Sequence, residues 1–236
     1  MSMIFSQKGL SLKLENFLKM TKNISGPSIE PLSLNIERIV IFLHGYGANG
    51  NDLISIAHEW KSHITNTLFV SPNAPFKCPW GGDSYQWFEL TSVSPEKIGE
   101  GLKKAGPYLN KFIDDLILQH TVTLNKIFFV TFSQGTMMGL YHLCKRSQSC
   151  AGIMGYSGLL FYDESFNKDV KSKFPVRLYH GKNDDIITFE QTIKASKKLK
   201  SLNFDVDHKI KDFLGHGIDE DGLEYGLEFI KKTFNI

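Results

Sequence analysis

A buried strand that ends in a serine constrains this chain more than any other feature. Residues 127–132 (IFFVTF) form a continuous apolar run, typical of a strand covered on both faces in a parallel sheet. Ser133 follows directly, Gly135 stands two places later, and residues 137–140 continue at helical spacing. A strand, a sharp turn with a serine and a helix together predict a nucleophile elbow, which lifts the serine hydroxyl above the sheet edge.

Thr131 departs from the usual pattern of this turn, G-x-S-x-G, because it stands in place of the first glycine. Strand and helix come close behind the serine, so a β-branched side chain there is expected to cost stability or to shift the turn. It removes no catalytic group. The simpler alternative is that Ser133 only caps an ordinary helix, and the motif alone leaves both interpretations open.

Two later loops offer the partners of a hydrolytic serine, in the chain order serine, acid, histidine. A strand at 176–179 precedes the adjacent carboxylates Asp184 and Asp185, and a strand at 206–210 precedes His216. Of the eight histidines, only His216 lies between two glycines on a loop before the last helix. His216 is therefore the predicted base that accepts the serine proton. Position alone leaves both carboxylates as candidates for the acid.

A glycine-rich loop is expected to complete the site. Residues 38–43 form another buried-strand pattern and lead into His44-Gly45-Tyr46-Gly47. The Tyr46 amide, between two glycines, and the Gln134 amide, at the start of the elbow helix, are the predicted donors to a substrate oxyanion. The loop has neither a P-loop lysine nor a G-x-G-x-x-G pattern, which disfavours a phosphate site.

Further segments carry a family resemblance. They are L-H-G-Y-G at 43–47, N-D-L at 51–53, S-P-N-A-P at 71–75, W-F at 87–88, F-S-Q-G at 132–135, H-G-x-x-D at 180–184 and G-H at 215–216. In their order and spacing the chain resembles the carboxylesterase/phospholipase family of α/β-hydrolases, which includes acyl-protein thioesterases and small bacterial carboxylesterases. The first 35 residues match only loosely. The resemblance implies Ser133 as nucleophile, Asp184 as acid, His216 as base, and oxyanion amides from Tyr46 and Gln134.

Strand and helix patterns alternate along the chain. Strands are expected at 39–43, 68–71, 127–132, 152–156, 176–179 and 206–210, and helices near 52–64, 96–119, 189–202 and 219–234. This alternation predicts a mostly parallel central sheet with helices on both faces, the α/β-hydrolase fold that the resemblance implies. Pro107 should kink the helix around it or begin a second one. We expect a single α/β domain over 1–236, with 1–35 supplying at most an opening strand or hairpin.

Composition narrows the class of protein. A formal net charge of +2 gives no reason to expect a nucleic-acid partner. Three cysteines without framework spacing indicate reduced thiols in a cytoplasmic protein, and neither a metal nor an organic cofactor is expected. No apolar run approaches the roughly 20 residues that span a bilayer, and no signal peptide is recognisable. Nothing in the sequence indicates the oligomeric state.

Two long connections, 72–95 and 157–175, hold the expected substrate surface. Its predicted members are apolar and lie near the serine in the fold: Phe76, Trp87, Phe88 and Leu159. The sequence thus predicts a serine hydrolase that cleaves esters or thioesters of short to medium acyl chains, carried by a small molecule, a lipid or a protein. The alternative is a non-catalytic hydrolase-fold protein that binds an acylated ligand or a protein partner, and a peptidase would share the triad.

Overall fold

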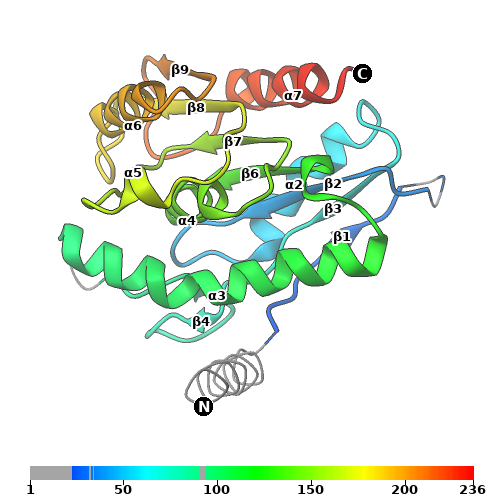
Figure 1. The fold of residues 1–236 in the computed structure, drawn as a ribbon, viewed down its shortest axis with the longest axis horizontal. Helices are drawn as coiled ribbons and strands as arrows, with labels where there is room; N and C mark the ends of the chain where they lie inside the picture. The colour runs from blue at the N-terminus through cyan, green and yellow to red at the C-terminus, as the bar shows by residue number, and fades with distance from the viewer. Residues whose placement is uncertain (1–22, 32, 34, 91–93) are drawn as a thin grey trace, which may run out of the picture.

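A seven-stranded sheet organises the molecule in this computed structural model, which describes residues 23–31, 33, 35–90 and 94–236 (Figure 1). Its strands, in spatial order, are β1 (Ser28–Ile29), β3 (Thr67–Val70), β2 (Arg38–Leu43), β6 (Ile127–Phe132), β7 (Gly152–Tyr156), β8 (Val176–Gly181) and β9 (Val206–Lys211). All neighbours are parallel except β1 and β3. The predicted mostly parallel sheet is confirmed.

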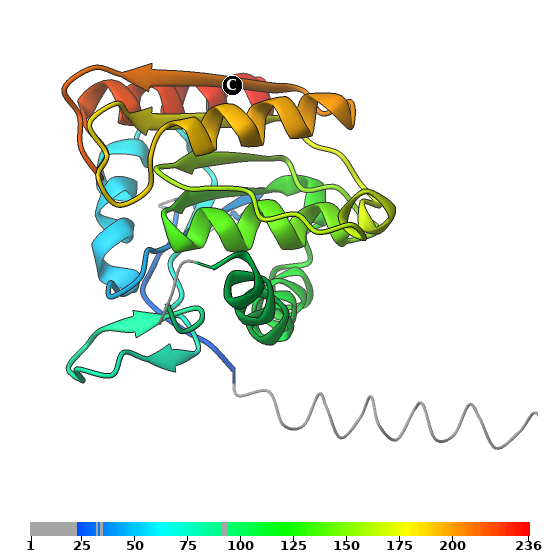
Figure 2. The same ribbon diagram turned by 90° about the vertical axis from the view of Figure 1, so that its left-hand side faces the viewer.

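Helices cover both faces of this sheet (Figures 1 and 2). They are α2 (Gly50–Trp60), α3 (Pro95–His120), α4 (Gln134–His142), α5 (Phe166–Asp169), α6 (Glu190–Ser201) and α7 (Glu220–Phe234), with short 3-10 turns η1 (Leu124–Lys126) and η2 (Leu143–Lys145). The helices α2 and α7 belong to one core layer, and α3, α4 and α6 to the other. No helix in the described part of the chain is long and apolar enough to cross a membrane.

The strand pattern explains the two layers. Successive side chains of a strand point to opposite faces. Ile39, Ile41 and Leu43 of β2 accordingly join the layer of α3 and α4, whereas Val40 and Phe42 join that of α2 and α7. All nine residues of α4 are buried, and its polar side chains, those of Gln134, Thr136 and His142, are hydrogen-bonded there. The elbow helix therefore lies in the core, where its start is held firmly.

Local chemistry sets the helix ends. Asn49 caps α2, since its side chain accepts from the Asn51 amide at 2.8 Å. Ser94 caps α3 with Pro95 in the first turn, where its missing N–H costs nothing. The helix continues through Pro107 to His120, so the alternative of a second helix beginning at Pro107 is wrong.

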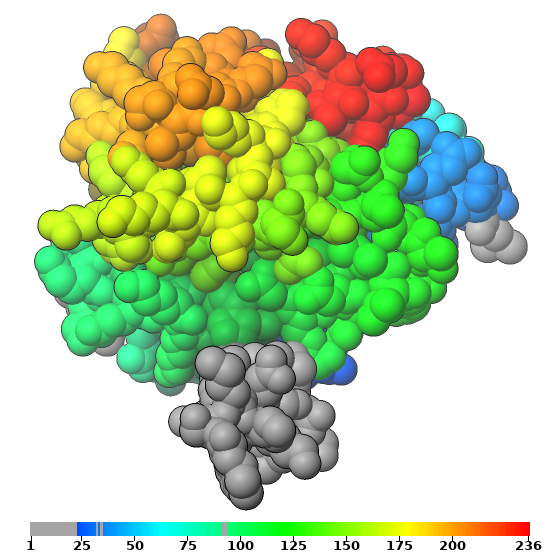
Figure 3. All heavy atoms as spheres, viewed as in Figure 1, coloured from blue at the N-terminus to red at the C-terminus, as the bar shows by residue number. Residues whose placement is uncertain are grey.

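Two segments add to the expected elements. The connection 72–95 contains a two-stranded antiparallel hairpin, β4 (Phe76–Lys77) and β5 (Tyr85–Gln86), which lies on the side toward which the parallel strands point (Figure 2). The segment 157–175 lies between α3 and α6 in Figure 3. Its Asp163 pairs with Lys103 of α3 at 3.4 Å, and Lys198 of α6 lies 4.8 Å from the Tyr162 ring centre. The opening strand expected within 1–35 is β1, and residues 1–22 lie outside the described residues.

Candidate active site

Ser133 occupies a strained turn between β6 and α4. Its φ is 53° and its ψ −116°, a conformation that costs a non-glycine residue roughly 1–3 kcal/mol and persists only where its surroundings impose it. The Ser133 amide donates to Tyr156 O at 3.0 Å, and its carbonyl accepts from Thr136 and Met137. A Cβ on Gly135 would lie 2.0 Å from Leu43 O, so only glycine fits there. Strand, strained serine and helix form the geometry of a nucleophile elbow.

The three residues expected from the sequence meet at the carboxyl ends of their strands. Ser133 Oγ lies 3.0 Å from His216 Nε2, and His216 Nδ1 lies 2.7 Å from Asp184 Oδ2. The serine is 7% exposed, and the His216 side chain is 19% exposed. The chain of contacts can pass the serine proton to the imidazole and hold the charge that forms on it.

Hydrogen bonds to its carboxylate stabilise the charged form of Asp184. Its Oδ1 accepts from the amides of Ile186 and Ile187, at 3.0 and 2.9 Å. Burial acts to raise the pKa of Asp184, but the hydrogen bonds from the Ile187 amide, from His216 and from the Ile186 amide together outweigh it, so the pKa lies below its ordinary value. Asp185, by contrast, is exposed. The structure thus brings Asp184, and not its neighbour, to the imidazole.

His180 forms a further contact of this acid. Burial lowers the pKa of His180, which favours the neutral ring. Its Nε2–H donates to Ile187 O at 2.7 Å and lies 3.0 Å from Asp184 Oδ2, while its Nδ1 accepts from Thr192 Oγ1 at 2.8 Å. Sequence reasoning did not predict this contact. The four-residue spacing from His180 to Asp184 was the signal that could have indicated it.

The amides of Tyr46 and Gln134 are the two that the sequence predicts as oxyanion donors. Neither Tyr46 N–H nor Gln134 N–H donates a hydrogen bond within the described residues. The loops that carry them emerge side by side, because Leu43 of β2 is opposite Thr131 of β6. A Cβ placed on Gly45 would lie 3.2 Å from Ser133 Cβ, so the first loop approaches the nucleophile closely. The arrangement can hold a negative oxygen next to the serine.

Comparison with known proteins identifies the family of this chain. The sequence model of the family described as Phospholipase/Carboxylesterase matches residues 24–234. The chain belongs to this family. Acyl-protein thioesterase 1 of Gibberella zeae is 25% identical over 90% of this chain and 97% of its own length. A probable inactive carboxylesterase of Oryza sativa subsp. japonica is 26% identical over 84% of this chain and 85% of its own. The crystal structure of esterase PE8 has a TM-score of 0.86 and 33% identity, over 90% of this chain and 100% of its own.

Thr131, the departure from the usual elbow, fits without disturbing the serine. It is fully buried, and its hydroxyl lies 3.0 Å from Thr136 Oγ1 and 3.2 Å from Met154 O. Thr136 in turn donates to Tyr156 O at 3.0 Å. The Thr131 methyl group occupies the space over Gly139, where a Cβ would be only 3.2 Å away. The side chain thus adds polar bonds behind the elbow, and the contact of Ser133 with His216 is kept.

Two predicted substrate residues are placed otherwise than expected. Trp87 is 0% and Phe88 1% exposed, so neither offers surface to an acyl chain, and the prediction that they bind substrate is wrong. The Phe76 ring packs edge-on against Tyr108 of α3, with the ring centres 5.5 Å apart. Leu159 is half-buried and follows Gly158, where a Cβ would be 3.1 Å from Ser133 O. Of the four predicted substrate residues, Leu159 is the one whose chain neighbour, Gly158, lies close to Ser133.

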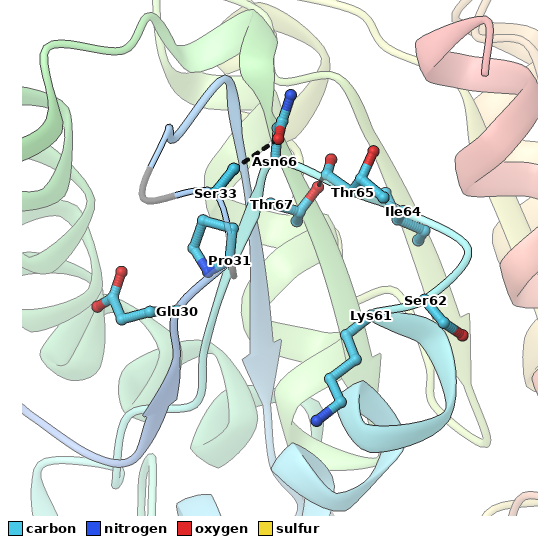
Figure 4. Close-up of a pocket in the computed structure, with 9 residues that line it drawn as sticks. All are labelled: Glu30, Pro31, Ser33, Lys61, Ser62, Ile64, Thr65, Asn66 and Thr67. Carbon is cyan, nitrogen blue, oxygen red and sulfur yellow. Dashed lines mark hydrogen bonds between the residues drawn. The ribbon is translucent and has the colours of Figure 1, made fainter.

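A hollow of about 330 Å³ lies elsewhere, at the amino end of β3 (Figure 4). Its lining residues come from the end of β1, the end of α2 and the start of β3: Glu30, Pro31, Ser33, Lys61, Ser62, Ile64, Thr65, Asn66 and Thr67. None of the residues near Ser133 is among them, and the triad lies at the opposite edge of the sheet. Within the described ranges, no group of three or more His, Cys, Asp or Glu side chains is placed to hold a metal ion.

Proposed function

We propose that the protein is a serine hydrolase that cleaves carboxylic esters and thioesters of short to medium acyl chains through an acyl-enzyme on Ser133. The observation that carries the proposal is the continuous chain of contacts from Ser133 Oγ to His216 and on to Asp184, at 3.0 and 2.7 Å. Membership of the phospholipase/carboxylesterase family supports ester hydrolysis as the reaction class.

Acylation begins at the serine hydroxyl. As Ser133 Oγ attacks the substrate carbonyl carbon, its proton passes to His216 Nε2. The imidazolium that forms is stabilised by the Asp184 carboxylate, which His216 Nδ1–H already contacts at 2.7 Å. The carbonyl oxygen becomes an oxyanion between the amides of Tyr46 and Gln134, each typically worth about 3 kcal/mol of barrier.

Collapse of the tetrahedral intermediate releases the first product. The bond from the carbonyl carbon to the leaving oxygen or sulfur breaks, and His216 gives its proton to the departing alcohol or thiol. A water molecule then repeats the sequence against the acyl-serine ester, with His216 again as base. The free acid leaves and Ser133 regains its proton, so the cycle needs no further reactant.

The rival interpretation, a non-catalytic binding protein, has less support. A rice relative is named a probable inactive carboxylesterase, and this name is the reason to weigh the rival. Thr131 was the only feature of this sequence that favoured the rival. Its hydroxyl is bonded behind the elbow, and Ser133, His216 and Asp184 keep hydrogen-bond distances. These contacts favour the catalytic proposal.

Labelling by a fluorophosphonate tests the proposal directly, alongside turnover of p-nitrophenyl and thioester substrates. Wild-type protein should be labelled, and Ser133→Ala should lose both the label and at least about 10³-fold in kcat. Ser71→Ala is the matched control, because Ser71 is another buried serine beyond a parallel strand, and its hydroxyl has no partner among the described residues. Unlabelled, inactive wild type would favour the binding protein, and a labelled Ser133→Ala would point to another nucleophile.

Substrate and location follow as parts of the proposal. The acyl group is carried by a small molecule, a lipid or a protein, and a relative named acyl-protein thioesterase 1 supports including acylated proteins. We place the protein in the cytoplasm, since its three cysteines are buried free thiols.

A further inference from the structure

One short segment contacts both loops that supply the oxyanion amides. Gly47 N–H donates to Tyr85 O at 2.9 Å, and Tyr85 N–H donates to Ala48 O at 2.9 Å. The loop of Tyr46 is therefore paired with the end of the β4–β5 hairpin. Trp87 and Phe88, two and three places after Tyr85, are buried in the core.

The elbow is tied to the same segment by the side chain of Gln134. Its Oε1 accepts from Trp87 N–H at 2.8 Å, and its Nε2 donates to Phe88 O at 2.8 Å. Gln134 is fully buried, so these peptide groups have no water to replace it. The side chain and the proposed oxyanion donor belong to one residue. The hydrogen bonds to the oxygen and the nitrogen of the side-chain carboxamide therefore also help to fix the direction of the backbone N–H of Gln134.

A third bond closes the connection. Trp87 Nε1–H donates to His44 O at 2.9 Å, and Trp87 is fully buried. His44 begins the loop of Tyr46, and its neutral ring is itself satisfied, because Nδ1 contacts Gly45 O at 2.7 Å and Nε2 accepts from Ala74 N at 2.9 Å. Burial lowers the pKa of His44, which is consistent with the neutral form.

We propose that the side chains of Gln134 and Trp87 are positioning residues that fix the spacing of the two oxyanion donors, Tyr46 N–H and Gln134 N–H. The Gln134 side chain joins the elbow to the backbone of Trp87 and Phe88, and the Trp87 side chain joins the same segment to the loop of Tyr46. The two loops are therefore both hydrogen-bonded to the segment 87–88. This inference rests on the proposed function. The two N–H donors lower the barrier only when they point at the oxyanion of the transition state. A small displacement of either donor should therefore lower kcat more than it weakens substrate binding.

Gln134→Met and Trp87→Phe test the inference. Methionine keeps the length of glutamine and removes both hydrogen bonds. Phenylalanine keeps a buried aromatic ring but removes the indole donor together with part of the ring volume. Gln86→Met is the matched control. Gln86 is also a buried glutamine, 3% exposed, and its Nε2 donates to Lys77 O at 2.8 Å within the hairpin. Its side chain forms no hydrogen bond with the described residues of either loop. Each protein is assayed with one p-nitrophenyl ester and with a trifluoromethyl ketone of the same acyl chain, which forms an oxyanion adduct on the serine.

Gln134→Met should lower kcat by about 10- to 100-fold, less than the 10²–10³-fold typical of deleting a donor, with KM within about threefold. The inhibition constant of the ketone should rise in proportion to the loss of kcat/KM. The acid side of the pH profile should keep its wild-type midpoint, because His216 and Asp184 are untouched. Trp87→Phe should have a smaller effect of the same kind, and the double variant should lose less than the product of the two. Gln86→Met should stay within about twofold of wild type.

A folded Gln134→Met protein with wild-type kcat and ketone affinity would overturn the inference. So would an equal loss in Gln86→Met, which would indicate general loosening of the hairpin. If Gln134→Met does not fold, Trp87→Phe decides, since it keeps an aromatic ring at this place in the core. An inactive, unlabelled wild type would instead refute the proposed function and this inference with it, whereas an active wild type with unaffected variants refutes the inference alone.

Discussion

His142 should make the protein lose stability as the pH falls below neutral. This last residue of α4 is 8% exposed, and its Nε2–H donates to Leu102 O of α3 at 2.8 Å. Burial lowers the pKa of His142 to about 4, with the bond to Leu102 O opposing the shift and Lys145 adding to it. The unfolded chain takes up this proton near pH 6.5, and the folded chain only near pH 4. Between these values the unfolded state binds more protons, so stability rises with pH and is lost on acidification.

The magnitude follows from the two pKa values. One pKa unit corresponds to about 1.4 kcal/mol, and the full shift in His142 is worth roughly 3 kcal/mol. Over the convenient range from pH 7.5 to pH 5, about 2 kcal/mol of this should appear. A loss of this size is large against the 5–15 kcal/mol that is typical of a folded domain.

Urea unfolding of wild type and His142→Met, at several pH values from 7.5 to 5, measures the effect. The variant loses one hydrogen bond, about 1 kcal/mol at every pH, but has no proton to take up. Wild type should therefore lose about 2 kcal/mol more than the variant over this range. His44 and His180 also have lowered pKa values, but they contribute equally to both proteins and cancel in the difference. Parallel stability curves for the two proteins would refute the reasoning.

Three other predictions concern the site. Asp184→Asn should lower kcat by on the order of 10³–10⁴-fold, and the exposed Asp185→Asn should change it less than twofold; the reverse pattern in kinetic assays would reassign the acid. Thr131→Gly should lower the free energy of unfolding, measured in urea, by about 2 kcal/mol or more, because a buried hydrogen bond and a methyl group are lost. Its kcat/KM should change less than about tenfold. A loss of several orders of magnitude in kcat/KM of the folded variant would assign the hydroxyl a catalytic role. Hexanoyl and octanoyl esters should outperform acetyl esters, by up to about 10²-fold for four methylenes; a steady fall from acetate to octanoate, measured below any micelle concentration, would indicate a short-chain esterase.

Local features of the sequence were enough for the sheet and for the order of the site residues. Buried parallel strands need continuous apolar runs, so residues 127–132 could be recognised without their neighbours. The carboxyl ends of parallel strands share one edge, and loops after three such strands carry Ser133, Asp184 and His216. Chain order and strand ends therefore predict which residues meet.

Tertiary structure decided what depends on contacts between distant segments. The residues alone left Asp184 and Asp185 open, and the amides of Ile186 and Ile187 together with His216 distinguish them. In the sequence, Thr131 only departed from the usual elbow pattern, and the structure shows that its hydroxyl is hydrogen-bonded to that of Thr136.

The aromatic residues Trp87 and Phe88 show the same limit most clearly. A large ring suits an acyl site and a core equally well, and a sequence pattern cannot tell whether a helix will cover it. Here Phe88 packs on Gly101 of α3, where a Cβ would lie 2.5 Å from the ring. The backbone and indole N–H groups of Trp87 donate to Gln134 Oε1 and His44 O. Exposure is a property of the assembled surface, and for these two rings only the packing of the whole chain determined it.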